Sequence, residues 1–189
     1  LRQGVDGLMG FSIGADEKDS KNNLLSIVQG GLTLGLKDYY LDPDPETAKI
    51  REAYVAYIRQ LVSHDGFGET DAARISDDVM RIETRLAKAS KSMTELRDPE
   101  ANYHKMSYDQ LKKDFAGIDW DAYLHIFGIS GLKDVIVGQP EAIHEVEKIL
   151  AEETPEALQN VYLWHAIDRA AGRRNLATTS TSTAWPSHT

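Results

Sequence analysis

Two segments whose apolar residues recur every three or four positions constrain the fold of this chain most. The first follows Asp44-Pro45, runs to about His64 and places on one face Ile50, Tyr54, Tyr57, Ile58 and Leu61. The second begins near Thr70 and carries Ile75, Val79, Ile82 and Leu86. Such spacing is typical of amphipathic α-helices, and an aspartate followed by proline suits a helix start. The chain is therefore predicted to contain two long helices that pack as an antiparallel pair.

Shorter helices are predicted further along the chain. Ser107 and Gln110 form a capping-box pattern, and Asp119 can cap a helix that follows it. Two more helices are predicted, one opened by Pro140 and one capped by Thr154 ahead of Pro155.

Strand signals are few. Phe11–Asp16 is a short extended segment ahead of a polar, turn-rich stretch, and the β-branched Val135–Gly138 is the best internal strand. The predicted fold class is mainly α, a multi-helical subdomain of about six helices with one or two short strands.

The composition argues against several classes of protein. The net charge of −9 disfavours nucleic acid as a partner, because such affinity comes mostly from Lys and Arg. No apolar run approaches the length that a membrane-spanning helix needs, and residues 1–10 lack the pattern of a signal peptide. The absence of cysteine removes disulfides and thiolate metal sites.

The helical pattern stops at Arg174. Residues 1–174 form the predicted helical domain, whereas residues 175–189 are rich in Ser and Thr and offer little to bury except Trp185. This tail is predicted to be disordered or foreign to the domain. Because the sequence opens on Leu1 rather than Met, we expect it to be cut from something longer.

His144-Glu145 begins like the H-E-x-x-H zinc motif, but position 148 is Lys148, whose ammonium group cannot bind zinc. The pair is therefore interpreted as a solvated helix surface. An isolated histidine beside Trp164 is interpreted as a packed residue rather than a catalyst. The histidines other than His144 show no ligand spacing among themselves: His64, His104, His125, His165 and His188.

The clustered carboxylates are also interpreted as structural or solvated residues rather than as metal ligands or catalytic groups. Asp42-Pro43-Asp44 lacks the glycine and the final glutamate of a calcium loop and is predicted to be a turn and a helix cap. Asp77-Asp78 and Glu152-Glu153 are expected on solvated helix faces, and nothing marks Asp114 and Asp119 as an acid–base pair. The residues alone thus predict no catalytic, cofactor-binding or metal-binding residue in this chain.

Four segments, in order, resemble one peptidase family. QGGLTLGLKDYYL begins at Gln29, IETRLAKAS at Ile82 and RDPEANYHKMS at Arg97, and VIVGQPEAI with LQNVYLWHAID closes the series. They are similar to segments of the helical domain of the neprilysin-type zinc metallopeptidases, peptidase family M13, which includes the bacterial endopeptidases O. His104 replaces the usual asparagine. The resemblance covers Phe11 to Arg174.

The resemblance implies a parent enzyme with two lobes that face each other across a cavity. One lobe is thermolysin-like and holds the zinc site, and the other is mainly helical, roofs the cavity and excludes large substrates. This chain resembles much of the helical lobe only, so the zinc ligands and the glutamate base are expected after residue 174. The implied partners are the catalytic lobe of the same polypeptide and an oligopeptide substrate. Zinc is implied for the parent and not for this fragment.

Gly30–Glu46 is interpreted as a structural segment. The glycines permit close backbone approach, and the leucines seat an irregular loop on the helices. Tyr39 and Tyr40 are expected to bury their rings while their hydroxyls find partners. In the alternative, this stretch lines the cavity, and Tyr39 or Tyr40 touches peptide.

Two functions remain open. In the first, the parent is a zinc metalloendopeptidase that cuts oligopeptides, this lobe provides enclosure and size selection, and the 189 residues alone are inactive. In the second, the segment is a stand-alone, non-catalytic helical protein-interaction module. The lack of cysteine favours a bacterial member, located in the periplasm or cell envelope, with the cytoplasm second.

Overall fold

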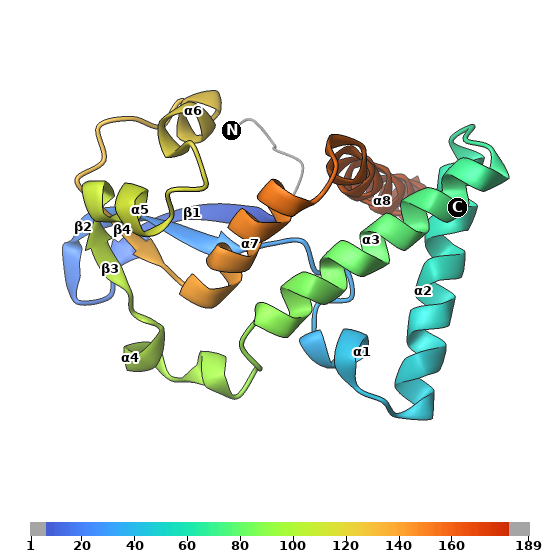
Figure 1. Cartoon of the computed structure of the whole chain (residues 1–189), viewed down its shortest axis with the longest axis horizontal. Coiled ribbons are helices and arrows are strands. Elements are labelled where there is room, and N and C mark those ends of the chain that lie inside the picture. Colours follow the sequence, from blue (N-terminus) through green and yellow to red (C-terminus); the bar gives the residue numbers. More distant parts are fainter. Residues whose placement is uncertain (1–6, 182–189) are drawn as a thin grey trace, which may run out of the picture.

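One small sheet lies beside a larger group of helices in this computed structural model, which describes residues 7–181, with side chains as far as residue 172 (Figure 1). The strands are β1 (Met9–Asp16), β2 (Asp19–Gln29), β3 (Lys105–Ser107) and β4 (Asp134–Val137). The helices are α1 (Lys37–Leu41), α2 (Pro45–His64), α3 (Glu69–Ala89), the 3-10 helix η1 (Glu95–Arg97), α4 (Pro99–Asn102), α5 (Tyr108–Asp114), α6 (Trp120–Ile126), α7 (Pro140–Glu152) and α8 (Pro155–Thr181).

The fold is mainly α, as the sequence predicts, but both predicted counts are too low. The described residues form eight α-helices and one sheet of four strands. The additional helices α1 and α4 span five and four residues, which is too short for an apolar period to show. The sequence does not predict β2, because polar residues fill its first half. It does not predict β3, because that strand has only three residues.

The two long predicted helices are present. α2 and α3 pack against each other and run in opposite senses (Figure 1). All four predicted residues of the α3 stripe, from Ile75 to Leu86, are buried. The α2 stripe is rotated relative to the prediction, because Val62 is buried whereas Ile50 and Tyr57 are exposed. α8 packs on both helices and fills the space that an isolated pair would leave open.

Side-chain caps begin the helices where the sequence predicts them. The Asp44 carboxylate accepts hydrogen bonds from the amides of Glu46 (3.0 Å) and Thr47 (3.3 Å) at the start of α2. The Ser107 hydroxyl accepts from the amide of Gln110 (3.1 Å), and Asp119 and Thr154 cap α6 and α8 in the same way. These acceptors satisfy amides that have no partner inside the helix.

The sheet has the order β1-β2-β4-β3. β1 and β2 form an antiparallel hairpin, β2 and β4 are parallel, and β3 returns antiparallel to β4. The predicted strand at Val135–Gly138 corresponds to β4, and Phe11–Asp16 lies within β1, which is an edge strand of the sheet. One face of the sheet packs on the helical core through Leu25, Ile27, Val135 and Val137.

The end of α8 differs from the prediction. The helix continues to Thr181, past Arg174, where the sequence pattern ends the helical domain. Ser and Thr lower helix stability only modestly, so a helix can continue through them. The prediction relies on the spacing of apolar residues, which these positions lack. The rest of the predicted Ser/Thr-rich tail, residues 182–189, lies outside the described residues, and its foreign origin stays a prediction. Over the described part of the chain, no helix is both long and apolar enough to cross a membrane.

The far end of the β1–β2 hairpin is tied to the rest of the fold by Asp16, which is 1% exposed. Its carboxylate accepts hydrogen bonds from the Lys105 ammonium (2.9 Å), the Lys18 amide (3.0 Å) and the Tyr103 hydroxyl (2.7 Å). These donors, led by Lys105, lower the pKa of Asp16 to about 2. Asp16 therefore connects β1 to β3 and to the loop before it.

Replacing Asp16 by asparagine should change how stability depends on pH. Because the folded pKa lies below the ordinary value, the carboxylate stabilises the fold above about pH 4 and loses that contribution as the pH falls towards 2. We expect the Asp16→Asn variant to be less stable at pH 7 and to show a smaller decline between pH 4 and pH 2. Urea unfolding at several pH values measures this, and parallel curves for both proteins would contradict it.

Candidate functional site

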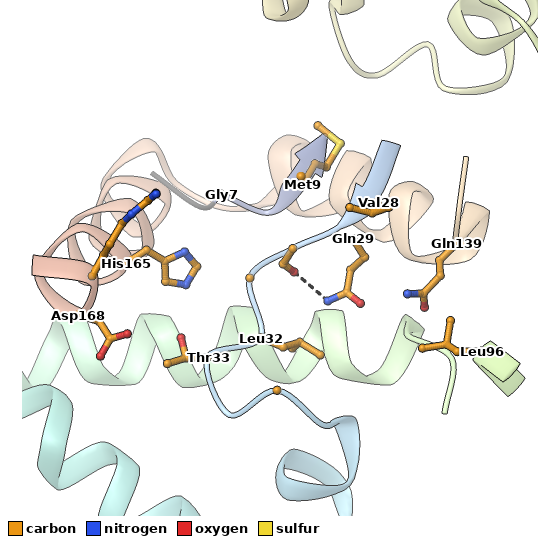
Figure 2. A pocket seen from close by; sticks show the side chains of 15 residues that line it. Gly7, Met9, Val28, Gln29, Leu32, Thr33, Leu96, Gln139, His165 and Asp168 are labelled. Atoms are coloured by element: carbon orange, nitrogen blue, oxygen red, sulfur yellow. Dashed lines mark hydrogen bonds between the residues drawn. The ribbon is translucent and has the colours of Figure 1, made fainter. Parts of the chain in front are cut away.

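A groove of about 550 Å³ runs between the β2–α1 loop, the start of β1 and α8. Figure 2 shows Thr33, His165 and Asp168 at one end and Gln139 and Leu96 at the other. Five glycines are among its lining residues: Gly7, Gly10, Gly30, Gly31 and Gly35. Much of the wall is therefore backbone, and concave sites of this volume are typical of ligand-binding regions.

The loop that follows β2 requires its glycines. A Cβ atom at Gly30 would lie 2.5 Å from the carbonyl oxygen of Gly7, and one at Gly31 would lie 3.0 Å from Leu86. Gly31 and Gly35 also have φ angles of 78° and 80°, which side-chain-bearing residues rarely adopt. The prediction that these glycines permit close backbone approach is confirmed.

Adding a single methyl group at Gly30 tests this packing. We expect Gly30→Ala to destabilise the chain by about 1–3 kcal/mol, because the backbone of Gly7 must move away from the new Cβ atom. Gly14→Ala is the matched control, since no atom lies within 4 Å of its added Cβ. Chemical unfolding of both variants measures the difference, and equal free energies of unfolding would refute the close contact.

Beneath the groove, the carboxylate of Glu83 is fully buried on α3. One oxygen accepts hydrogen bonds from the hydroxyls of Tyr40 (2.6 Å) and Tyr54 (2.9 Å). The other accepts from the hydroxyl of Thr33 (2.8 Å) and lies 3.0 Å from Nε2 of His165. We call these five residues the Glu83 cluster.

Both tyrosine hydroxyls accept a hydrogen bond from another group, and this determines the direction of their hydrogen bonds to Glu83. The Leu34 amide donates to the Tyr40 hydroxyl (3.0 Å), and the Trp164 indole donates to the Tyr54 hydroxyl (2.9 Å). Each tyrosine therefore directs its own proton at Glu83. Burial first, and then the nearby Glu83 carboxylate, raise the pKa of both tyrosines well above the ordinary value. Both remain neutral donors.

The Glu83 cluster holds one wall of the groove in place. Thr33 and His165 line the groove and also contact the buried carboxylate. Tyr40 fixes the loop from below through the Leu34 amide, so the predicted burial of its ring and pairing of its hydroxyl are confirmed. Tyr39 is half-buried, and neither tyrosine is among the groove-lining residues. The arrangement positions backbone rather than presenting a reactive group.

Replacing Glu83 by glutamine should lower the stability of the fold. The amide group would point a donor at hydroxyls that are themselves donors, leaving buried polar groups without partners. We expect a loss of about 2–4 kcal/mol in the free energy of unfolding. Glu52→Gln on the exposed face of α2 is the control, with an expected change within about 0.5 kcal/mol. A loss for Glu83→Gln no greater than the control, measured by chemical denaturation, would contradict the role assigned to the cluster.

The paired carboxylates do not all lie on solvated surfaces, contrary to the prediction. The side chains of Asp78 and Glu153 are only 16% and 10% exposed, and both bind Arg81. Arg85 also contacts Glu153 (3.0 Å) and Glu145 (2.8 Å). The pairs of Arg81 and Arg85 with Glu153 and Glu145 connect α3 to α7, and they explain why these acids are only partly exposed, because paired charges can lie at a packed interface.

The other residues weighed in the sequence as possible metal ligands or catalytic groups make contacts that stabilise the fold. His144 stacks on the Phe115 ring and pairs with Glu147 (2.8 Å). Asp42 and Asp44 form the predicted turn and cap. Asp114 accepts a hydrogen bond from the Gln110 side chain. Across the part of the chain that the structure describes, no three His, Cys, Asp or Glu residues are grouped as a metal site requires.

Sequence reasoning missed Glu83, although a signal was present. Position 83 follows Val79 by four residues and precedes Leu86 by three, so it belongs to the apolar face of α3. A carboxylate on such a face must find partners in the core. His165 is buried, which agrees with the interpretation of a packed histidine.

The sequence profile of Peptidase family M13 matches residues 1–183. The chain belongs to peptidase family M13. Among its relatives, Neprilysin-3 of Drosophila melanogaster is 30% identical over 171 residues, 85% of this chain and 22% of that protein. Endothelin-converting enzyme 1 of Mus musculus is 29% identical over 84% of this chain and 21% of that protein. The chain thus spans about a fifth of the length of these M13 relatives.

Solved M13 structures share the fold. The zinc metalloprotease Zmp1 of Mycobacterium tuberculosis, solved in an open state, superposes with a TM-score of 0.79 at 27% identity. The match covers 86% of this chain and 25% of that one. PepO from Lactobacillus rhamnosis HN001 has a TM-score of 0.67 at 19% identity, which supports the fold alone. The family that the sequence resembles is confirmed.

Proposed function

We propose that this chain is the helical lobe of a zinc-dependent metalloendopeptidase that hydrolyses oligopeptides, and that it roofs the substrate cavity and restricts substrate size. The family match over residues 1–183 carries this proposal. The similarity to Zmp1, a zinc metalloprotease, over 86% of the chain supports it. In this proposal the catalytic lobe of the same polypeptide is the partner and oligopeptides are the substrates.

The zinc ion of such an enzyme does not fit the residues described here. His144 is engaged by Glu147, Glu145 binds Arg85, and Lys148 occupies the position of the second histidine. Zinc requires three or four neutral imidazole, carboxylate or thiolate ligands at one point. We therefore assign the zinc ligands and the reacting groups to sequence outside this chain, and to this lobe the exclusion of water and of large substrates.

The gene product that contains this chain tests the proposal. We expect the full-length protein to cleave a short fluorogenic peptide, to lose that activity with a chelator and to regain it with zinc. Folded proteins of any sequence should resist cleavage, and the 189-residue chain alone should be inactive. A full-length product without chelator-sensitive cleavage would reject the proposal and favour a stand-alone interaction module.

A further inference from the structure

The outer edge of β1 carries backbone groups that no other described strand pairs. The Gly30 amide donates to the Leu8 carbonyl (3.0 Å), so these two residues form a hydrogen-bonded pair at the start of the β1–β2 ladder. Such pairs alternate with non-hydrogen-bonded pairs along an antiparallel ladder. The N–H and C=O groups of Phe11 and Ile13 therefore point away from β2. In the described part of the chain, the backbone of neither residue bonds to a loop or helix.

The neighbouring strand shows the same alternation. Ile27 lies opposite Phe11 in the ladder. Its carbonyl accepts a hydrogen bond from the Gly138 amide (2.9 Å), which follows β4, on the side away from β1. The backbone groups of Phe11 are thus directed to the free edge rather than to Ile27.

The free edge also presents apolar side chains. Ile13 is 69% exposed. Phe11, on the same face of β1, is half-buried because its ring lies against Tyr123 of α6 (5.4 Å between ring centroids) and Phe127 just after it (5.6 Å). Ile126, at the end of α6, is 63% exposed. Single exposed apolar residues are normal, but several beside an unpaired strand indicate an interaction surface.

β1 lacks the devices that keep edge strands apart. Exposed edges are commonly protected by charged side chains, by proline or by a bulge within the strand. Residues 10–15 (GFSIGA) contain no charge and no proline, and residues 23–28 opposite them on β2 are uncharged too. Asp16 ends the strand at an irregularity in register and is paired with Lys105 (2.9 Å). The edge is therefore open to another strand.

We propose that a second copy of this chain occupies this edge, with the two β1 strands antiparallel about a two-fold axis at Ser12. In this register Phe11 of each copy lies opposite Ile13 of the other, and both residues supply the outward backbone groups that a hydrogen-bonded pair needs. Aromatic and β-branched side chains form favourable cross-strand pairs, and the two-fold axis makes the pair twice. On the other face of the strand only Gly10, Ser12 and Gly14 meet, so no bulky side chain opposes the approach. The inference does not depend on the proposed function, because it needs neither zinc nor a second lobe.

Cysteine cross-linking tests the register, because the chain contains no cysteine. In the proposed dimer two Ser12→Cys thiols face each other in a non-hydrogen-bonded pair, whose Cα atoms lie about 4.5 Å apart, within reach of a disulfide. Gly14→Cys is the matched control on the same face, and no atom lies within 4 Å of its added Cβ. Its two copies would be four residues, about 13 Å, apart along the strands. We expect mild oxidation to link Ser12→Cys at least about ten-fold faster than Gly14→Cys.

Association of the chain without cysteine gives a second test. Sedimentation velocity of the unaltered 189-residue chain at concentrations up to about 100 µM should show a dimer. Ile13→Lys should be monomeric, because it places an ammonium group opposite Phe11 of the other copy. Met93→Lys, at another exposed apolar residue (53%), should still form the dimer. Because Ile13 is exposed, its replacement should leave the free energy of unfolding of the monomer within about 0.5 kcal/mol of the original.

The contrary outcomes are distinct. A monomeric unaltered chain, or equal oxidation rates for Ser12→Cys and Gly14→Cys, would overturn the inference. A monomer whose Ile13 amide gains protection from hydrogen exchange only when an oligopeptide is added would also overturn it, and would assign the edge to a peptide strand. None of these results affects the proposed function, which chelator-sensitive cleavage by the full-length protein tests separately.

Discussion

The carboxylate of Glu83 is the group around which this fold is organised. It lies fully buried on α3 and receives hydrogen bonds from residues of α1, α2 and the β2–α1 loop, with His165 of α8 beside it. A buried charge is tolerated only when donors surround it, so these elements must come together in one arrangement. The hydrophobic stripes bring the helices together, and the polar cluster specifies how they meet.

The same cluster connects the core to the surface. Through Thr33 and Tyr40 it fixes a glycine-rich loop whose backbone approaches Gly7, and this loop walls the groove. Ion pairs from Arg81 and Arg85 join α3 to α7, and Asp16 ties down the far end of the hairpin. The loop and the helices that wall the groove are thus anchored to buried groups.

The sequence predicts the long helices well because apolar spacing and side-chain caps are local signals. Asp44, Ser107 and Asp119 each cap a helix as their neighbours indicate. The parallel pairing of β2 with β4 joins strands far apart in the chain, and no local pattern reports it. The place of Glu83 on the apolar face of α3 is a local signal of burial, but its partners come from four separate segments, which no local pattern reports. Asp78 and Glu153 are predicted to be solvated because the sequence does not show that both pair with Arg81 and are only partly exposed.

Native-state hydrogen exchange at the Leu34 amide tests the central claim most directly. This amide lies in an irregular loop and donates to the Tyr40 hydroxyl, which donates in turn to Glu83. If the buried cluster fixes the loop, the Leu34 amide should exchange about as slowly as the core amides of α3, and Tyr40→Phe should abolish that protection while sparing the amide of Ile82. Exchange of the Leu34 amide at the rate of an exposed loop in the unaltered chain would contradict the account.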